Sequence, residues 1–246
     1  MIYDIIFCVF GCPTIPHYKN QILKINETWG REVIKYNCKI LFFFGEEDTD
    51  LKSDNYIYLK GVNNDYESAS DKQNLGLKYI HEKYDYKFVY ICGTDTYVVV
   101  KNLIKFIVNQ DPYDNICIGA GDTRYINDEP IFFHLGGGGI ILSTYSVNII
   151  YLKLENMFND WKKICYNNTN RTFNLIPACD VAICYYLFKS GCKFINRRDL
   201  FFVCPYYSCY YNNILKLNII SCHNMTLDEF DNYTNFLESL PDHNDI

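Results

Sequence analysis

The fold is decided by the stretch FVYICGTDTY, at residues 88–97. Its first half is a short run of apolar, β-branched and aromatic residues, which predicts a strand. Its second half is small and polar. Ligands of open α/β sheets bind beyond the carboxyl ends of the strands. We therefore expect Asp95, just past this strand, to stand at the edge of a binding site.

Four more runs of the same kind surround this stretch, at residues 2–10, 39–44, 56–59 and 116–120. Segments with helical spacing of apolar residues alternate with them, at residues 19–29, 70–84 and 102–109. Ser70 and Gln73 form a capping-box pattern at the start of the second helical segment. The alternation predicts an α/β fold, with a mostly parallel, Rossmann-like twisted sheet that is doubly wound and flanked by helices.

The second half of the chain is less regular. It contains four consecutive glycines at residues 136–139 and three predicted helices, at residues 143–157, 180–191 and 227–240. No repeat or linker divides the chain, and 246 residues are within the range of one α/β core. We expect a single domain over residues 1–246.

The charge of the chain argues against a nucleic-acid partner. The formal net charge is -6, and no stretch gathers enough Lys and Arg to neutralise a row of phosphates. Arg197 and Arg198, with Lys193, form a local basic group. This basic group could bind one diphosphate, although a solvent-exposed turn is the better explanation of these residues.

Location and redox compartment stay open. The first ten residues lack the features of a signal peptide, and no run is long enough to span a bilayer. A chain that is soluble in the cytoplasm and one whose secretory targeting lies elsewhere both fit.

The chain has 12 cysteines without a repeated zinc-type spacing. Cys204 and Cys209 flank a turn and could pair, and five Asn-X-Ser/Thr sequons suit either glycosylation or chance.

Two residues are candidate metal ligands. Asp95 follows a strand in a small, polar loop, where a carboxylate can meet a divalent cation that bridges a diphosphate. An Asp that caps the turn or the next helix is an equally good explanation of this residue. His223 ends an apolar run and has an imidazole suited to the same ion, although a lone His at a strand end is more often structural.

The glycine run and Asp180 are candidates for substrate contact and catalysis. Four glycines in a row indicate a close approach of the backbone, either to substrate or to other backbone. Asp180 stands at the start of a predicted helix. It suits a general base that takes the proton of an acceptor hydroxyl, and it also suits a helix N-cap, which is the better explanation of this residue taken alone.

Together and in this order, these segments resemble the Fringe-like and core-1 β1,3-galactosyltransferase group. The resemblance covers about residues 2–224. It rests on ETWG at 27–30 with the strand at 39–44, the helix containing Lys72 with FVYICGTDTYV at 88–98, HLGGGGIILS at 134–143, CDV at 179–181 and SCH at 221–223.

The resemblance implies a GT-A fold and an inverting transfer, β1,3-linked, from a UDP-sugar to a hydroxyl of a glycan or glycoprotein. It implies Mn²⁺ held by Asp95 and His223, and Asp180 as base. The UDP-sugar would be bound by the residues Thr94, Asp95, Lys72, Gly137 and Gly138. The nucleotide-binding half would be about 1–120, the acceptor-side half about 121–224, and the C-terminal helix and tail 225–246.

The chain departs from the pattern of this group at several positions. Gly93 and Thr94 stand where the group has acids, Cys179 replaces an acid, and Cys184 stands where a glycine is usual. Crowding near the acceptor pocket would follow from Cys184. The group's membrane anchor and stem do not occur in this sequence. One alternative is a catalytically degenerate carbohydrate-binding or scaffold protein. Another is a metal-independent transferase in which Arg197, Arg198 or Lys72 neutralises the diphosphate.

Overall fold

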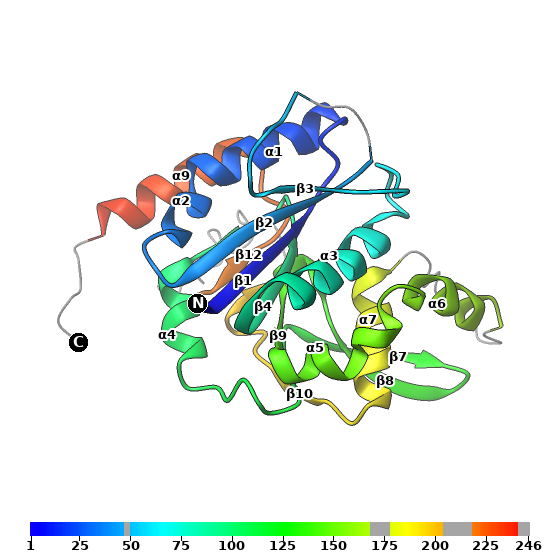
Figure 1. Ribbon diagram of the computed structural model, residues 1–246. Helices are drawn as coiled ribbons and strands as arrows, with labels where there is room; N and C mark the ends of the chain where they lie inside the picture. Colours follow the sequence, from blue (N-terminus) through cyan, green and yellow to red (C-terminus); the bar gives the residue numbers. More distant parts are fainter. Residues whose placement is uncertain (47–49, 168–177, 204–217, 241–246) are drawn as a thin grey trace.

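A central sheet of seven strands organises the molecule (Figure 1). The structure is a computed structural model that describes residues 1–46, 50–167, 178–203 and 218–240. The strand order is β10-β6-β9-β4-β1-β2-β3. Only β9 runs antiparallel to its neighbours in this sheet, so the expected mostly parallel sheet is confirmed. The bounds are β1 Ile2–Phe10, β2 Cys38–Gly45, β3 Tyr56–Leu59, β4 Asp85–Gly93, β6 Ile116–Gly119, β9 Ile140–Ser143 and β10 Lys193–Asn196.

Helices cover both faces of the sheet, because successive side chains of a buried strand point to opposite faces. Ile5, Phe7 and Val9 of β1 pack on one face, in a core shared with α1 (Pro16–Glu27), α2 (Trp29–Val33), α4 (Val100–Ile107) and α9 (Leu227–Ser239). Ile6 and Cys8 pack on the other, in a core shared with α3 (Ala69–Lys83), α5 (Thr144–Ile150), α6 (Met157–Tyr166) and α7 (Cys179–Lys189).

Two details differ from the expected helices. The segment expected as one helix at residues 143–157 contains α5, a 3-10 turn at Tyr151–Lys153 and the start of α6. Buried Ile150, Leu154 and Met157 keep helical spacing through the break, so their periodicity does not reveal it. The capping box at Ser70 is wrong: α3 begins after Ser68 at its N-cap, which hydrogen-bonds with Asp65 in the preceding turn.

The C-terminal helix α9 begins with a capping box that the sequence analysis did not identify. The Thr226 side chain accepts the backbone N–H of Glu229, whose carboxylate accepts the N–H of Thr226. The helix lies along α1 (Figure 1), where Lys24 pairs with Asp231 at 2.9 Å. Within the described ranges, no helix is long and apolar enough to cross a membrane.

Two smaller sheets lie beside the main one. Strand β5 (Tyr97–Val98) pairs with β12 (Ser221–Cys222), which pairs with β11 (Phe201–Phe202). Strands β7 (Gly121–Ile126) and β8 (Glu129–His134) form a hairpin. The ten cysteines within the described ranges are free thiols. Cys204 and Cys209, the possible pair, lie outside those ranges.

The position of Gly139 depends on the absence of a side chain. Its φ is +84°, and a Cβ there would lie 2.1 Å from the hydroxyl oxygen of Tyr90 in β4. That hydroxyl is buried and donates to the carbonyl of Gly138 at 2.8 Å. The chain therefore enters β9 through a space that only glycine fits, as the glycine run predicts.

We expect Gly139→Ala to destabilise the protein strongly. It combines backbone strain with a clash against a buried ring, and it should lower the free energy of unfolding by at least about 3 kcal/mol. Gly61→Ala is the matched control, because Gly61 also has positive φ (+73°) but has open space around it, and it should cost only about 1 kcal/mol. Urea unfolding measures both. Equal losses would contradict this account of Gly139.

Candidate functional site

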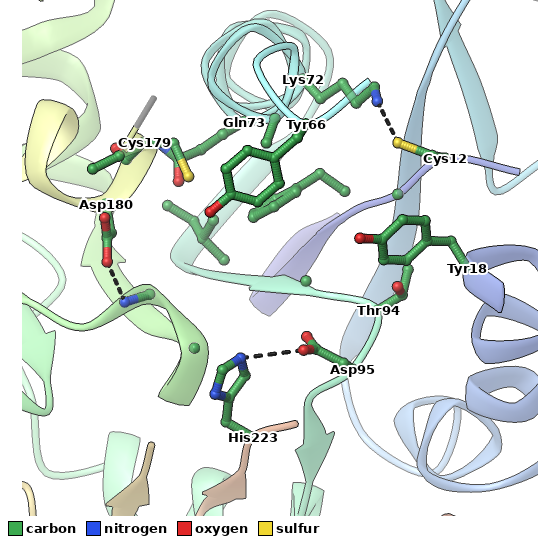
Figure 2. Close-up of a pocket in the computed structure, with 18 of the residues that line it drawn as sticks. Cys12, Tyr18, Tyr66, Lys72, Gln73, Thr94, Asp95, Cys179, Asp180 and His223 are labelled. Atoms are coloured by element: carbon green, nitrogen blue, oxygen red, sulfur yellow. Dashed lines mark hydrogen bonds and ion pairs between the residues drawn. The ribbon is translucent and has the colours of Figure 1, made fainter. Parts of the chain in front are cut away.

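A cavity of about 350 Å³ opens at the carboxyl ends of β1 and β4 (Figure 2). This is where the fold class places ligands. Segments from the whole length of the chain contribute to its wall. The lining residues used below are Gly11, Cys12, Tyr18, Tyr66, Lys72, Gln73, Thr94, Asp95, Gly136, Gly137, Cys179, Asp180 and His223.

Asp95 and His223 meet at the floor of this cavity. The Asp95 Oδ2 and His223 Nε2 atoms are 3.2 Å apart (Figure 2). Strand pairing brings them together: Tyr97 of β5 lies opposite Cys222 of β12, and the backbone N–H of Met225 donates to the Asp95 carbonyl at 3.0 Å. Burial alone would lower the pKa of His223, but the hydrogen bond and charge of Asp95 outweigh it and raise that pKa above its ordinary value.

The spacing of this pair suits one divalent ion. An octahedral ion with ligand distances of about 2.1 Å holds adjacent ligand atoms about 3 Å apart. The separation of Oδ2 and Nε2 is close to that value. Among the described residues, no group of three His, Cys, Asp or Glu side chains converges on one point. Asp95 and His223 would thus be two of the side-chain ligands of such an ion.

Thr94, which precedes Asp95, is turned toward the protein. Its side chain is almost fully buried, and its hydroxyl donates to Gln21 Oε1 of α1 at 2.7 Å. From the sequence, Thr94 is expected to bind the donor. The structure places it on the cavity wall with its hydroxyl engaged by the protein.

The glycine loop closes the cavity beside His223. A Cβ on Gly137 would lie 2.5 Å from His223 Nδ1, and a Cβ on Gly136 would lie 2.9 Å from the Asp180 Cβ. Both glycines line the cavity. Gly138, also expected there, is not among the lining residues; it is buried, with its carbonyl accepting from Tyr90 and Ser221. The close approach is thus to protein side chains.

Asp180 is held by backbone donors on the wall opposite Lys72. Its Oδ2 accepts the N–H of Gly136 at 2.9 Å and its Oδ1 accepts the N–H of Val181 at 2.8 Å. The N-cap of α7 is Ala178, so the cap interpretation of Asp180 is wrong. Burial raises the pKa of the Asp180 carboxyl, and the hydrogen bonds from Gly136 and Val181 only partly oppose this.

Lys72 reaches the cavity wall from α3. The residue is only 1% exposed, and its Nζ donates to Cys12 Sγ at 2.9 Å (Figure 2). Cys184 is buried against the backbone of His134 and is not a lining residue, whereas Cys179 is. Arg197, another of the cations considered for a diphosphate, forms a two-point ion pair with Asp199 and is not a lining residue.

Sequence reasoning missed part of this wall. The missed lining residues include Cys12, Tyr18, Tyr66 and Gln73. The rule that selected Asp95 also applied to Cys12, because Cys12 follows the carboxyl end of β1. Tyr18 and Tyr66 carried no such signal. Gln73 donates to the carbonyl of Cys179 at 3.1 Å and so connects α3 with α7 across the cavity.

Solved structures of glycosyltransferases share this fold, although no protein-family model matches the chain. The galactosyltransferase LgtC, in complex with donor and acceptor sugar analogs, has 13% identity and a TM-score of 0.55, with 98% of each chain covered. A glycosyltransferase involved in the glycosylation of the major capsid of PBCV-1 has 13% identity and a TM-score of 0.55, with 95% of this chain and 99% of that chain covered.

A third similar structure is the glycosyltransferase GlyE of Streptococcus pneumoniae TIGR4, with 13% identity and a TM-score of 0.52 over 93% of this chain and 56% of that chain. The chain thus has the α/β fold of GT-A glycosyltransferases, as expected from sequence. These structures do not specifically support the Fringe-like and core-1 group. At 13% identity they establish the fold alone.

We expect Gly137→Ala to separate His223 from Asp95. The new methyl group has no room beside the imidazole, so the ring must move. Without Asp95 next to it, the pKa of His223 should fall, because burial would then dominate. NMR titration of the histidine rings in metal-free buffer measures this, with the signal assigned by His223→Gln. An unchanged His223 titration would contradict the proposed crowding, and Gly191→Ala, in open space, is the control.

Proposed function

We propose that the chain is a glycosyltransferase that moves a hexose or N-acetylhexosamine from a UDP-sugar to a hydroxyl of a glycan or glycoprotein. The observation that supports this most is the convergence of Asp95, His223 and Asp180 in one cavity of a GT-A fold. These residues come from three separate segments, and each offers a group that such a transfer requires.

Asp95 and His223 are the proposed ligands of a divalent cation such as Mn²⁺. Their 3.2 Å spacing fits two adjacent positions of one ion. When bound, the ion would neutralise charge on the diphosphate leaving group. Lys72 is proposed to add a second positive charge from the wall of the cavity. Tyr18 and Tyr66 offer aromatic faces on which the uracil base or a sugar ring can stack.

Asp180 is the proposed general base. It would accept the proton of the acceptor hydroxyl while that oxygen attacks the anomeric carbon and the bond to the diphosphate breaks. The N–H of Gly136 fixes one carboxylate oxygen, which keeps the group oriented. Its raised pKa improves its affinity for the proton. One base in line with the leaving group gives inversion, and the proposed linkage is β1,3.

The second candidate is a carbohydrate-binding protein that lost catalysis. The observation in its favour is the absence of acids at Gly93 and Thr94, which leaves Asp95 as the carboxylate at that position. Two features support the transferase over it. Asp95 and His223 are close enough to share an ion, and the cavity between them and Asp180 is open.

We expect UDP to bind in a Mn²⁺-dependent manner. Removing the carboxylate ligand in Asp95→Ala should weaken UDP binding in Mn²⁺ at least about tenfold. Asp71→Asn is the matched control, because Asp71 is a half-buried acid of the neighbouring α3 outside the cavity lining. Isothermal titration calorimetry measures both. A folded wild-type protein that binds no UDP with Mn²⁺ would rule out the proposed transferase.

We expect Asp180→Asn to keep donor binding and lose transfer. The asparagine oxygen can still accept the N–H of Gly136, and only the hydrogen bond from the adjacent Val181 N–H is lost, so the fold should hold, but an amide cannot take a proton. Transfer should fall about 100-fold or more, with UDP affinity nearly unchanged. UDP release across a panel of UDP-sugars, and NMR of the product's anomeric configuration, are the measurements. Unchanged turnover would remove Asp180 from the role of base.

A further inference from the structure

Cys12 and Lys72 form a pair whose thiol and amine nucleophiles the proposed transfer does not use. Cys12 lies in the loop after β1, and Lys72 lies in the first turns of α3. The Lys72 Nζ donates to Cys12 Sγ at 2.9 Å (Figure 2). Both side chains are nearly buried, with exposed fractions of 8% for Cys12 and 1% for Lys72, and both line the cavity.

The Lys72 ammonium has an unusual environment for a buried cation. A buried charge is costly unless it is paired. Among the described residues no carboxylate lies within ion-pair distance of Lys72; Asp65 and Asp71 influence it only from farther away. Its hydrogen-bond partner is a sulfur atom, which is a weak acceptor when protonated. The buried ammonium therefore points at a thiol that balances its charge only as a thiolate.

The other described cysteines lack such a cation. Burial raises the pKa of the Cys38 thiol to about 11 and of the Cys165 thiol to about 12. Burial also raises the pKa of Cys179, which lines the same cavity. Thiolates react with peroxide, and cysteines next to Lys or Arg are the ones that do so selectively. Cys12 combines that neighbour with access from the cavity.

We propose that Cys12 and Lys72 are a covalent modification site, at which peroxide oxidises Cys12 to a sulfenic acid and the Lys72 amine then condenses with it. In the first step the Cys12 sulfur attacks peroxide. A sulfur–oxygen bond forms, the oxygen–oxygen bond breaks, sulfur loses two electrons, and peroxide is reduced to water.

The second step links the two side chains. The sulfenic acid is neutral and gives the buried ammonium no counter-charge, and the Nζ atom must release one proton to water before it can react. The Nζ lone pair then attacks the sulfur at hydrogen-bond distance. A sulfur–nitrogen bond forms, the sulfur–oxygen bond breaks, and the hydroxyl leaves as water. Per pair, one thiol, one ammonium and one hydrogen peroxide give one sulfenamide, two waters and one proton.

The link has a consequence for the cavity, and this consequence rests on the proposed function. It replaces the positive charge of Lys72 by a neutral bridge, and it fixes the loop after β1 to α3. A diphosphate would meet less positive charge there, so UDP should bind more weakly to the oxidised protein. Thiol reductants would reverse the change, because sulfenamides return to thiol and amine.

The test is oxidation of the full chain with hydrogen peroxide, followed by peptide mapping with mass spectrometry. We expect the peptides containing Cys12 and Lys72 to be joined with the loss of two hydrogens, and dithiothreitol to release them. Dimedone added with peroxide should trap the sulfenic acid at Cys12. Cys179 is the internal control, since it shares the cavity without the cation and should be oxidised about tenfold or more slowly.

Two variants separate the charge of Lys72 from its nucleophilic amine. Lys72→Arg keeps a cation next to the sulfur but has no free amine, so Cys12 should still give the dimedone adduct while the link disappears. Lys72→Met removes both, and oxidation of Cys12 should slow about tenfold. Cys12→Ser should give no link at all. Circular dichroism verifies that each variant is folded, and the mapping of the wild type stands without any of them.

Two results would overturn the proposal. One is a wild-type protein in which Cys179 or Cys38 is oxidised while Cys12 stays a thiol. The other is a Cys12 that forms a disulfide or a higher oxide without joining Lys72. UDP affinity is measured separately, before and after oxidation. If the untreated protein binds no UDP, the proposed transferase fails while the link between Cys12 and Lys72 is still decided by the peptide map.

Discussion

The antiparallel pairing of β5 with β12 is the interaction on which the candidate site depends. It is only two residues long, yet it brings His223 to Asp95 across more than half of the chain. The strand pair is tied to the glycine loop and to β4, because Ser221 of β12 and Tyr90 of β4 donate hydrogen bonds to the same carbonyl, that of Gly138. The glycine loop is thereby pinned between the β4 core and the last strand. These hydrogen bonds hold the glycine loop at the floor of the cavity, which is the support that the proposed pair of metal ligands would need.

The sequence predicts five of the seven strands of the main sheet, because burial leaves a strong pattern, and it does not predict β9 and β10. The runs that become β1, β2, β3, β4 and β6 are apolar on both faces, and helices with helical spacing fall between them. The sequence predicts helix boundaries poorly where apolar residues keep helical spacing although the backbone has left the α-helix. Leu154 and Met157 continue the spacing of α5 although the chain leaves the α-helix at Tyr151. The start of α3 was misplaced because Ser68 and Asp65 form a local turn that competes with the box expected at Ser70.

The candidate site, like the fold, was predicted from the sequence only in part. Asp95, Asp180 and His223 follow from strand ends, a helix start and a resemblance, and the structure brings all three to one cavity. The contacts of the cavity wall were not accessible from sequence. That Lys72 faces a thiol, that Thr94 turns toward Gln21, and that Gly138 lies behind the wall are consequences of side-chain packing between distant segments. Spacing along the chain carries no information about such pairs.

The reversed strand β9 has a consequence for how the molecule can be divided. Strand β6 belongs to the first half of the chain, but its neighbours in the sheet are β9 and β10, which both come from the second half. Strand β9 also separates β6 from β4. A fragment ending near residue 120 would therefore leave β6 with no strand to pair with, and would expose the edge of β4 that pairs with β9. The two halves of the chain are thus parts of one seven-stranded sheet, and a cut between them would disrupt that sheet.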